Sequence, residues 1–463
     1  MSPVNGTSQV RIQLQTKSPE LQLPQEIGPI LVRTGFKRLQ LSQLVNSLLE
    51  NEESHIPLQF LINGQYLKTT IDDFLTQNGI SAETTLAVEY VKALIPPQTI
   101  ASYEHDDWVS SVDVLSGSSQ AARWSSQSPQ QSRILSGSFD GLIRVWGMSS
   151  DLLATGTGHS SAVKSAKFIS PTQVVSSSGD RTLRLWKYED ADVGSASLTP
   201  TLELYGHSAS VDSVAVHAPS SRILSASADH TVGIWSTRKS DAPAAQEELI
   251  PVSNKRRKIT PTAKPTATRG PLSLMSGHAS QVAEVCFDET DASVAYSVSW
   301  DHTLKTWDLA TSKCIDTRTT PQSLWSVCHL PEKSLVAAGT ALKHITLIDP
   351  RVSAQTVSAM TLRGHTNAIV SMARDPNSSH QLLSGSYDGT CRIWDLRSVR
   401  NDASERIGES VFIIERDAVR QAKKLGTRRE DIGGVKVFGV AWDAEVGMVS
   451  GAEDKKVQID RQT

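Results

Sequence analysis

Apolar residues occupy alternate positions in many short stretches of this chain, and that spacing predicts a protein built mainly from β-strands. From residue 105 onward one unit recurs: a Ser-rich strand ends in Asp, and a Trp follows six residues later, as in "SGSFDGLIRVW" (136–146) and "SGSYDGTCRIW" (384–394). Five copies keep the Asp, the Trp and a preceding His. Two further copies are degenerate. One has Leu342 and Ile348 at the Asp and Trp positions, and the other keeps Asp454 but has Asp460 at the Trp position.

These seven units average about 41 residues once the insertions 237–272 and 398–432 are set aside, which is the length of a four-stranded propeller blade. One blade cannot bury both faces of its sheet, so the units are expected to stack around an axis. The units resemble the WD-repeat family, and the resemblance implies a seven-bladed β-propeller. It also implies that the His, Asp and Trp of each complete unit join a strand Ser in a buried hydrogen-bond network. The residues of this structural network are His105, Asp140, Trp146, His159, Asp180, Trp186, His207, Asp229, Trp235, His278, Asp301, Trp307, His365, Asp388 and Trp394.

Ser, His and Asp also form the catalytic triads of hydrolases, which gives this network a second interpretation. Five equivalent triads around a ring cannot all be active sites, whereas a blade-stabilising network has to recur once in each blade. The sequence contains no phosphate-binding Gly-rich loop, and its four cysteines form no C-x-x-C pair. The chain is therefore predicted not to be an enzyme and to hold no metal of its own.

The last unit ends so close to the C-terminus that it lacks a fourth strand. The stretch "TIASYE" (99–104) has strand character, and we expect it to pair as the outer strand of that unit. Such pairing would close the ring without a covalent link and cover an exposed sheet edge. The polar stretch 116–132 is predicted to be a mobile loop within the first unit.

The N-terminal residues show a different order of elements. Residues 9–91 read as strand, strand, helix, strand, short helical turn and strand, with Ser42 as a possible helix cap and Asn63–Gly64 as a hairpin turn. This order resembles a ubiquitin-like β-grasp domain. Its closing strand runs into "KALIPPQ" rather than a Gly-Gly tail, so we expect non-covalent docking. The expected organisation is therefore a disordered stretch at 1–8, this domain at 9–91, a linker at 92–98 and the propeller at 99–463.

Composition narrows the range of partners. The formal net charge is −3, with 46 Lys and Arg against 49 Asp and Glu, so no global attraction to nucleic acid or anionic lipid is expected. No apolar run approaches the length of about 20 residues that crosses a bilayer. The N-terminal residues lack the apolar core of a signal peptide. These features predict a cytosolic or nuclear protein.

The combination of a ubiquitin-like unit, a Pro-Pro link, "HDDWVSSVDV" (105–114) and a WD-repeat ring resembles the Ytm and WD-repeat protein 12 family of eukaryotic ribosome-assembly factors. The stretches "FLINGQYLKTT" (60–70), "GISAETTLAVEY" (79–90) and 437–460 carry the same resemblance, and the Notchless factor shares the architecture. The resemblance implies work on the pre-60S particle that supports rRNA processing. It implies that the propeller binds a Bop/Erb-type WD-repeat protein, which in turn holds Pescadillo. The ubiquitin-like domain would dock on the metal-ion-dependent adhesion site of the ATPase midasin, which pulls assembly factors off the particle.

The same resemblance assigns a role to Glu83. An adhesion site of this kind holds Mg²⁺ with its own oxygens and leaves one position open, and a partner's carboxylate fills that position. Glu83 matches the family's position for this ligand, so the only cofactor implied is Mg²⁺ shared with the partner. Without the resemblance, Glu83 would be one more solvated loop acid. Among the neighbouring acids, Asp72 and Asp73 are explained by the first turn of a helix, and Glu89 lies within the last strand.

The insertions carry weaker signals. The basic cluster Lys255, Arg256, Arg257 and Lys258 lies in a Pro-rich segment that is expected to be disordered, and it reads as a nuclear localisation signal or as a solvated basic loop. We favour nuclear, nucleolar and nucleoplasmic localisation, and contact of this loop with rRNA phosphate stays open. Residues 398–432 are predicted to be a long loop that is partly helical around 415–425. The alternative function is a ubiquitin-pathway adaptor whose propeller receives substrates.

Overall fold

The computed structural model describes residues 8–23, 27–49, 55–125, 129, 131–190, 196–249, 266–352, 359–402, 405–425 and 435–462. The chain divides into two compact units. One consists of Met1–Pro96, Leu396–Gly408 and Gln462, and the other of Pro97–Asp395, Glu409–Arg461 and Thr463. The predictions for residues 1–7 and for the basic cluster 255–258 lie outside the described residues.

The N-terminal unit is a five-stranded sheet with two α-helices. Its strands lie in the order β2-β1-β5-β3-β4, with β1 parallel to β5 and the other pairs antiparallel. This is the β-grasp arrangement predicted from the element order. The elements are β1 (Gln9–Gln15), η1 (Pro19–Leu21), β2 (Ile30–Arg33), α1 (Arg38–Leu48), β3 (Leu58–Ile62), β4 (Gln65–Tyr66), α2 (Ile71–Asn78) and β5 (Leu86–Lys92).

The period-two pattern of β5 places Leu86, Val88 and Tyr90 in the core, where they are at most 4% exposed. Asn63 and Gly64 both have positive φ values, 51° and 79°, as the two-residue turn between β3 and β4 requires. The proposed cap at Ser42 is wrong. Helix α1 begins at Arg38, and Ser42 lies buried within the helix, where its hydroxyl donates to the carbonyl of Ile56.

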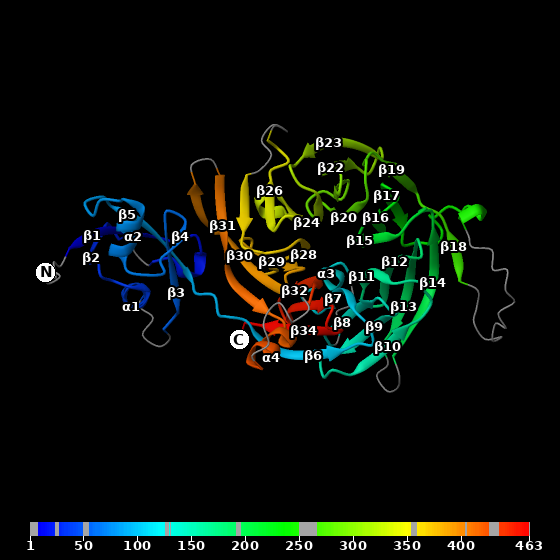
Figure 1. Cartoon of the computed structure of the whole chain (residues 1–463), viewed down its shortest axis with the longest axis horizontal. Coiled ribbons are helices and arrows are strands. Elements are labelled where there is room, and N and C mark those ends of the chain that lie inside the picture. Colours follow the sequence, from blue (N-terminus) through cyan, green and yellow to red (C-terminus); the bar gives the residue numbers. More distant parts are fainter. Residues whose placement is uncertain are drawn as a thin grey trace. The chain divides into compact units, whose positions relative to one another are not determined.

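The second unit is a ring of seven blades, the propeller that the repeats predict (Figure 1). Five blades are separate sheets, and blades 5 and 6 are joined in one eight-stranded sheet. Figure 1 shows the first strand of each blade near the centre of the ring and the later strands further out. Apolar side chains are buried between blades 1 and 2, 2 and 3, 3 and 4, 4 and 5, 6 and 7, and 7 and 1, so stacking supplies the core that one blade lacks.

The strands of the seven blades follow the order of the chain, apart from the outer strand of the last blade. Blades 1 to 3 contain β7 (Val109–Leu115), β8 (Arg133–Ser138), β9 (Ile143–Gly147), β10 (Leu152–Gly156), β11 (Val163–Ser170), β12 (Gln173–Ser178), β13 (Thr182–Glu189), β14 (Ser197–Tyr205), β15 (Val211–His217), β16 (Arg222–Ser227), β17 (Thr231–Ser236) and β19 (Ser273–Ser276). Blades 4 to 6 contain β20 (Val282–Phe287), β21 (Val294–Ser299), β22 (Thr303–Asp308), β23 (Lys313–Thr319), β24 (Leu324–Leu330), β25 (Leu335–Thr340), β26 (His344–Ile348), β27 (Met360–Arg363), β28 (Ile369–Arg374), β29 (Gln381–Ser386), β30 (Thr390–Asp402) and β31 (Glu405–Glu415). Blade 7 contains β32 (Val437–Asp443), β33 (Gly447–Ala452), β34 (Lys456–Arg461) and β6 (Gln98–Glu104).

The ring closes as the sequence predicts. Strand β6 pairs antiparallel with β34, from Gln98 opposite Arg461 to Glu104 opposite Lys456. The outer strand of blade 7 is therefore supplied by residues that precede blade 1 in the chain. The pairing leaves β34 without an open edge.

Two insertions are more ordered than the sequence suggests. Within 116–132, the predicted mobile loop contains the short helix α3 (Gln120–Arg123), capped by Ser119, and Trp124 packs its ring against His217 of β15. Within 398–432, the predicted loop is instead part of a β-hairpin formed by β30 and β31. Strand β31 is the outer strand of blade 6, and it also pairs with β27 of blade 5. The predicted helix there is present as α4 (Asp417–Lys424).

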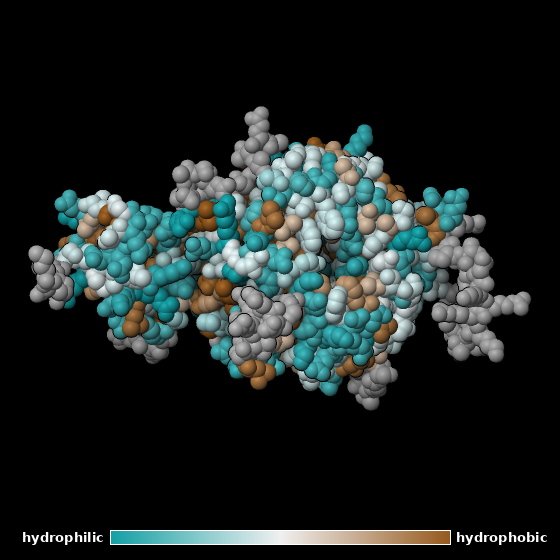
Figure 2. Space-filling view, viewed as in Figure 1, coloured by the Kyte–Doolittle hydropathy of each residue, from teal (hydrophilic) through white to brown (hydrophobic). Residues whose placement is uncertain are grey.

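The insertion 237–272 has ordered ends. It contributes η2 (Glu247–Leu249) and β18 (Ala267–Arg269), and β18 pairs in parallel with the outer strand of blade 2. A third 3₁₀ turn, η3 (Pro331–Lys333), connects β24 and β25. In the described part of the chain, every helix is too short or too polar to traverse a lipid bilayer. The face of the propeller seen in Figure 2 is mostly hydrophilic or intermediate, with hydrophobic residues in small separate patches.

Candidate functional site

Glu83 lies in the turn that connects α2 to β5. Helix α2 ends at Gly79, whose φ of 64° stops the helix, and the next backbone N–H, of Ile80, donates to the carbonyl of Leu75 at 3.0 Å. Ser81 then organises the turn. Its carbonyl accepts the N–H of Thr84 at 3.2 Å, and its hydroxyl accepts the N–H of Glu83 at 3.3 Å. The backbone that carries Glu83 is therefore held on both sides.

The side chain of Glu83 is exposed, and within the described residues its carboxylate has no hydrogen-bond or ion-pair partner. Ile80 and Ala82, in the same turn, pack against the core of the unit. A free carboxylate thus projects from an anchored turn, which limits the entropy lost when it binds. The same carboxylate meets the requirement for one hard oxygen ligand of Mg²⁺. In the described part of the chain no group of three His, Cys, Asp or Glu side chains is arranged to hold a metal, so Glu83 offers one ligand rather than a site.

The neighbouring acids already have local roles. Asp73 accepts the N–H of Thr70 at 3.3 Å, and the Thr70 hydroxyl accepts the N–H of Asp73 at 3.1 Å, which is a capping box for α2. Asp72 lies in the same first turn, where the helix dipole favours a negative charge. Glu89 pairs with Lys17 at 3.0 Å. Glu83 differs from all three in having no such local use.

The blade network connects four residue types through one serine. The histidine Nε2 lies 2.7–2.8 Å from the serine Oγ in the five complete blades. The tryptophan Nε1 donates to the same oxygen at 2.7–2.9 Å. In blades 2, 3, 4 and 6 the histidine Nδ1 also lies 2.8–2.9 Å from the aspartate. The serines are Ser136, Ser176, Ser225, Ser297 and Ser384. Because the His, Ser, Asp and Trp side chains of blades 2, 3, 4 and 6 bond to one another within each blade, the geometry is that of a structural network.

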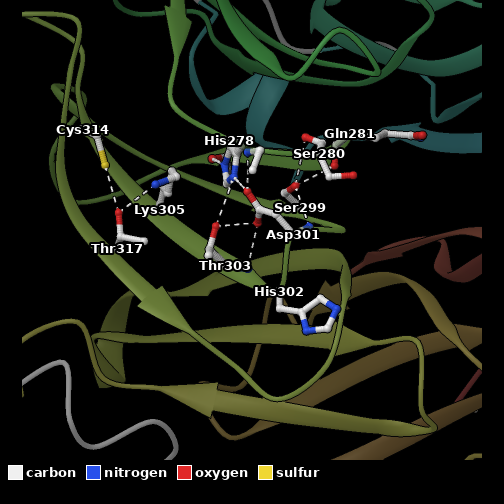
Figure 3. A network of polar contacts seen from close by, with 12 residues as sticks. His278, Ser280, Gln281, Ser299, Asp301, His302, Thr303, Lys305, Cys314 and Thr317 are labelled. Atoms are coloured by element: carbon white, nitrogen blue, oxygen red, sulfur yellow. Dashed lines mark hydrogen bonds and ion pairs between the residues drawn. The ribbon is translucent and has the colours of Figure 1, made fainter.

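Figure 3 shows the part of this network around Asp301 in blade 4. The Asp301 carboxylate lies 2.9 Å from His278 Nδ1 and accepts the hydroxyl of Thr303 at 2.6 Å. It also accepts the N–H of Thr303 and the N–H of Ala279, both at 2.9 Å. The threonine two residues after the aspartate recurs in blades 2, 3 and 6 and was not predicted, although its fixed spacing is a readable signal.

These contacts set the protonation states. Burial would raise the pKa of Asp301, but hydrogen bonds from Thr303, Ala279 and His278 outweigh it and lower the pKa to about 2. The pKa values of Asp180, Asp229 and Asp388 are lowered for the same reason. Burial lowers the pKa of His278 and His365 despite their aspartate partners. His278 and His365 are therefore neutral, and Asp180, Asp229, Asp301 and Asp388 are charged, at neutral pH.

Blade 1 departs from the predicted network. His105 does not reach Asp140, and its Nδ1 lies 3.4 Å from the carbonyl of Tyr103 instead. Arg144 forms an ion pair with the aspartate instead, with Nη2 2.7 Å from Asp140 Oδ2. Two residues after this aspartate, Leu142 occupies the position at which the other complete blades have threonine. Burial and the Arg144 charge lower the pKa of His105 to about 4. The stronger charge of the guanidinium explains why it displaces the neutral imidazole.

In blade 7 an arginine takes the place of the network histidine, which the sequence did not reveal. Arg416 is 1% exposed and occupies the histidine's role. Its Nε and Nη2 donate to the two oxygens of Asp454 at 3.0 and 2.6 Å, and its Nη1 donates to the hydroxyl of Ser450 at 2.7 Å. The guanidinium also donates to the carbonyls of Ser450 and Lys456. Arg416 precedes α4, far from Asp454 in the sequence, so no local spacing pointed to it.

A belt of aromatic side chains runs across blades 4, 5, 6, 7 and 1. Successive ring centroids lie 5.3–6.0 Å apart. Lys164 and Lys436 lie over two of these rings, at 4.9 and 5.7 Å from the centroids of Phe139 and Tyr387. The aromatic belt consists of Trp300, Trp325, Tyr387, Phe438, Trp108 and Phe139. In three complete blades the residue directly before the network aspartate is one of these aromatics, a signal that sequence reasoning missed.

The belt is partly open to solvent. Trp300 is 42% exposed and Trp108 is 38% exposed, and the other four members are half-buried. Such a row of rigid aromatic side chains beside cations is typical of a protein-binding surface, because aromatic residues supply much of the binding energy at interfaces.

The fold and the two sites define a WD-repeat β-propeller protein with an additional β-grasp domain. Comparison with family models agrees. The NLE (NUC135) domain matches residues 10–75, and the WD domain, G-beta repeat, matches residues 97–147, 150–187, 198–236, 269–308 and 357–395.

Comparison with curated proteins identifies the family more closely. The chain is similar to "Ribosome biogenesis protein ytm1" of Aspergillus terreus, with 58% identity over 98% of this chain and 96% of the relative. The proteins of the same name from Neosartorya fischeri and Aspergillus niger are 57% and 56% identical, over 98% and 99% of this chain and 95% and 96% of the relatives. The chain belongs to the ytm1 family of ribosome biogenesis proteins.

Proposed function

We propose that this chain is a non-enzymatic assembly factor of the large ribosomal subunit that links a pre-60S complex to a removal ATPase. Its family membership supports a role in ribosome assembly. The blade networks support a scaffold rather than a catalyst, because their His, Ser and Asp groups are occupied within each blade.

The N-terminal unit supplies the link to the ATPase. Glu83 completes the coordination of a Mg²⁺ ion that belongs to the adhesion site of midasin. The observation that carries this proposal is the free, exposed carboxylate on a turn held by Gly79 and Ser81. Aspartate at this position would keep the charge but fall about one methylene short of the metal, since a Mg²⁺–O bond is only about 2.1 Å long.

The propeller supplies the link to the pre-60S complex. Its aromatic belt binds the Bop/Erb-type WD-repeat protein, which holds Pescadillo. The belt supports this role because it combines exposed indoles with Lys164 and Lys436, which favour a partner surface that is apolar at its centre and acidic at its rim.

The site of action of such a factor is the nucleolus and nucleoplasm, and the relatives' name supports this location. The basic cluster Lys255–Lys258 would serve as the import signal. Removing these four residues from a tagged copy should shift the protein to the cytoplasm. Continued nucleolar accumulation, with import on a partner excluded by a belt variant, would argue against the signal.

A pull-down with the full chain tests the proposed function. Wild-type protein and the matched control Asp72→Ala should retain midasin in Mg²⁺ and lose it in EDTA, whereas Glu83→Ala should lose it in both. Retention of midasin by Glu83→Ala would overturn the coordination proposal. Recovery of cullins or proteasome subunits in place of large-subunit precursor rRNA would support the ubiquitin-pathway adaptor instead.

A further inference from the structure

Strand β6 is held less by apolar burial than the strands inside the blades. Of its seven side chains only Tyr103 is buried, at 2% exposed, near the end of the strand that leads into blade 1. Its ring stacks on Trp146 at 5.7 Å. At the opposite end, where the chain arrives from the N-terminal unit, Gln98 and Ile100 are exposed. Apolar packing therefore contributes little at that end, where backbone pairing with β34 and polar side chains hold the strand.

A cluster of polar side chains lies at this end. The Thr99 hydroxyl donates to Asp460 Oδ1 at 2.6 Å and accepts from Arg420 Nη1 at 3.0 Å. Gln458 Nε2 lies 3.3 Å from the same hydroxyl and 3.0 Å from Asp460 Oδ2. Gln458 and Asp460 are 1% and 2% exposed. We name Thr99, Asp460, Gln458 and Arg420 the closure cluster.

The closure cluster depends on the two departures of blade 7 from the repeat. Asp460 stands where five blades have tryptophan, and a tryptophan could not accept a hydrogen bond from Thr99. Helix α4 brings Arg420 to the cluster, and the N–H of Asp417, at the start of α4, donates to Gln458 Oε1 at 3.0 Å. The departure of blade 7 from the repeat thus replaces the tryptophan indole by polar groups that bind β6.

When the chain is pulled from its N-terminal end, the tension passes along the backbone and enters the propeller at Gln98, the first residue of β6. Strand β6 is antiparallel to β34, so Gln98 and the C-terminal end of β34 lie at the same end of the pair. Tension between these two points therefore separates the strands one residue pair at a time, beginning with Gln98 and Arg461. The next pair is Thr99 opposite Asp460, which is the closure cluster.

We propose that the closure cluster is a mechanical latch that keeps β6 on the propeller when the N-terminal unit is pulled. This inference rests on the proposed function for the source of the pull, but the latch itself is a property of this chain alone. Without it, tension would peel β6 away and open the ring before the propeller left its complex.

The test is force spectroscopy on the full chain, held by its N- and C-terminal ends, with the opening rate of β6 measured at constant force. Thr99→Val keeps the branched shape but removes the hydroxyl, and it should open β6 about tenfold faster than wild type. Ser102→Ala, an exposed change on the same strand, and Thr99→Ser, which restores the hydroxyl, should both open at the wild-type rate.

Equal opening rates for Thr99→Val and Ser102→Ala would overturn the latch. Glu83→Ala should open at the wild-type rate, since no partner is present in the assay. Failure of the latch and failure of the metal-ligand proposal are therefore separate outcomes.

Discussion

Replacing Arg416 by alanine tests whether this residue stands in for the missing histidine of blade 7. The guanidinium makes five hydrogen bonds, two to the Asp454 carboxylate, one to the Ser450 hydroxyl and two to backbone carbonyls. Asp454 and Ser450 are buried or nearly so, and the substitution would leave a carboxylate and two carbonyls without their donor. Breaking a buried, hydrogen-bonded ion pair on one side costs about 3–5 kcal/mol.

We therefore expect Arg416→Ala to lower the free energy of unfolding of the propeller by about 3–5 kcal/mol. Urea unfolding followed by tryptophan fluorescence measures this change. The matched control is Arg351→Ala, because Arg351 also pairs with an aspartate but its side chain is 65% exposed. That variant should change stability by less than about 0.5 kcal/mol. If both variants unfold at the same urea concentration, Arg416 does not hold blade 7 together.

Three further predictions follow from buried and exposed groups. The pKa of His105 is about 4 in the folded chain and about 6.5 when unfolded, so the unfolded state binds the proton first and stability falls by about 2 kcal/mol between pH 7 and pH 5. His105→Gln should lose most of this slope in urea titrations, and an unchanged slope would contradict the assignment. Trp325→Ala should weaken binding of the Bop/Erb-type partner at least 30-fold in calorimetry, as an interface anchor does, while Leu152→Ala, outside the belt, should not. Cys314 is exposed, whereas burial raises the pKa of the Cys391 thiol to about 12. A maleimide should therefore label Cys314 rapidly and Cys391 only after unfolding. Equal labelling rates would show that Cys391 is not buried.

Local patterns predicted the parts of the fold that depend on short spacings. The interval between Asp and Trp marked the blades, and the alternation of 99–104 was sufficient to assign β6 to blade 7. The hairpin turn at Asn63–Gly64 followed from the backbone conformation that only such residues readily adopt. These features are determined by neighbours in the sequence, which explains why they could be read from it.

Contacts between distant segments were not predictable in this way. Arg416 reaches Asp454 across 38 positions, and nothing in its charge-mixed surroundings distinguished it from a solvated arginine. Serine is a residue type that often caps helices, but α1 begins at Arg38, so Ser42 lies inside the helix, where its hydroxyl bonds to the carbonyl of Ile56. In blade 1, Arg144 displaced His105 from Asp140 because a nearby cation outcompetes a neutral imidazole for a carboxylate. Glu83 was singled out by family resemblance alone, and its role as a metal ligand stays a prediction; the structure shows that its side chain is exposed.

The most direct measurement is the structure of the full chain bound to the midasin adhesion site at a resolution that identifies metal ligands. We predict one carboxylate oxygen of Glu83 at about 2.1 Å from the Mg²⁺ ion, with the turn at Gly79–Thr84 unchanged from its free conformation. A water molecule or a different side chain at that coordination position would contradict the proposed docking.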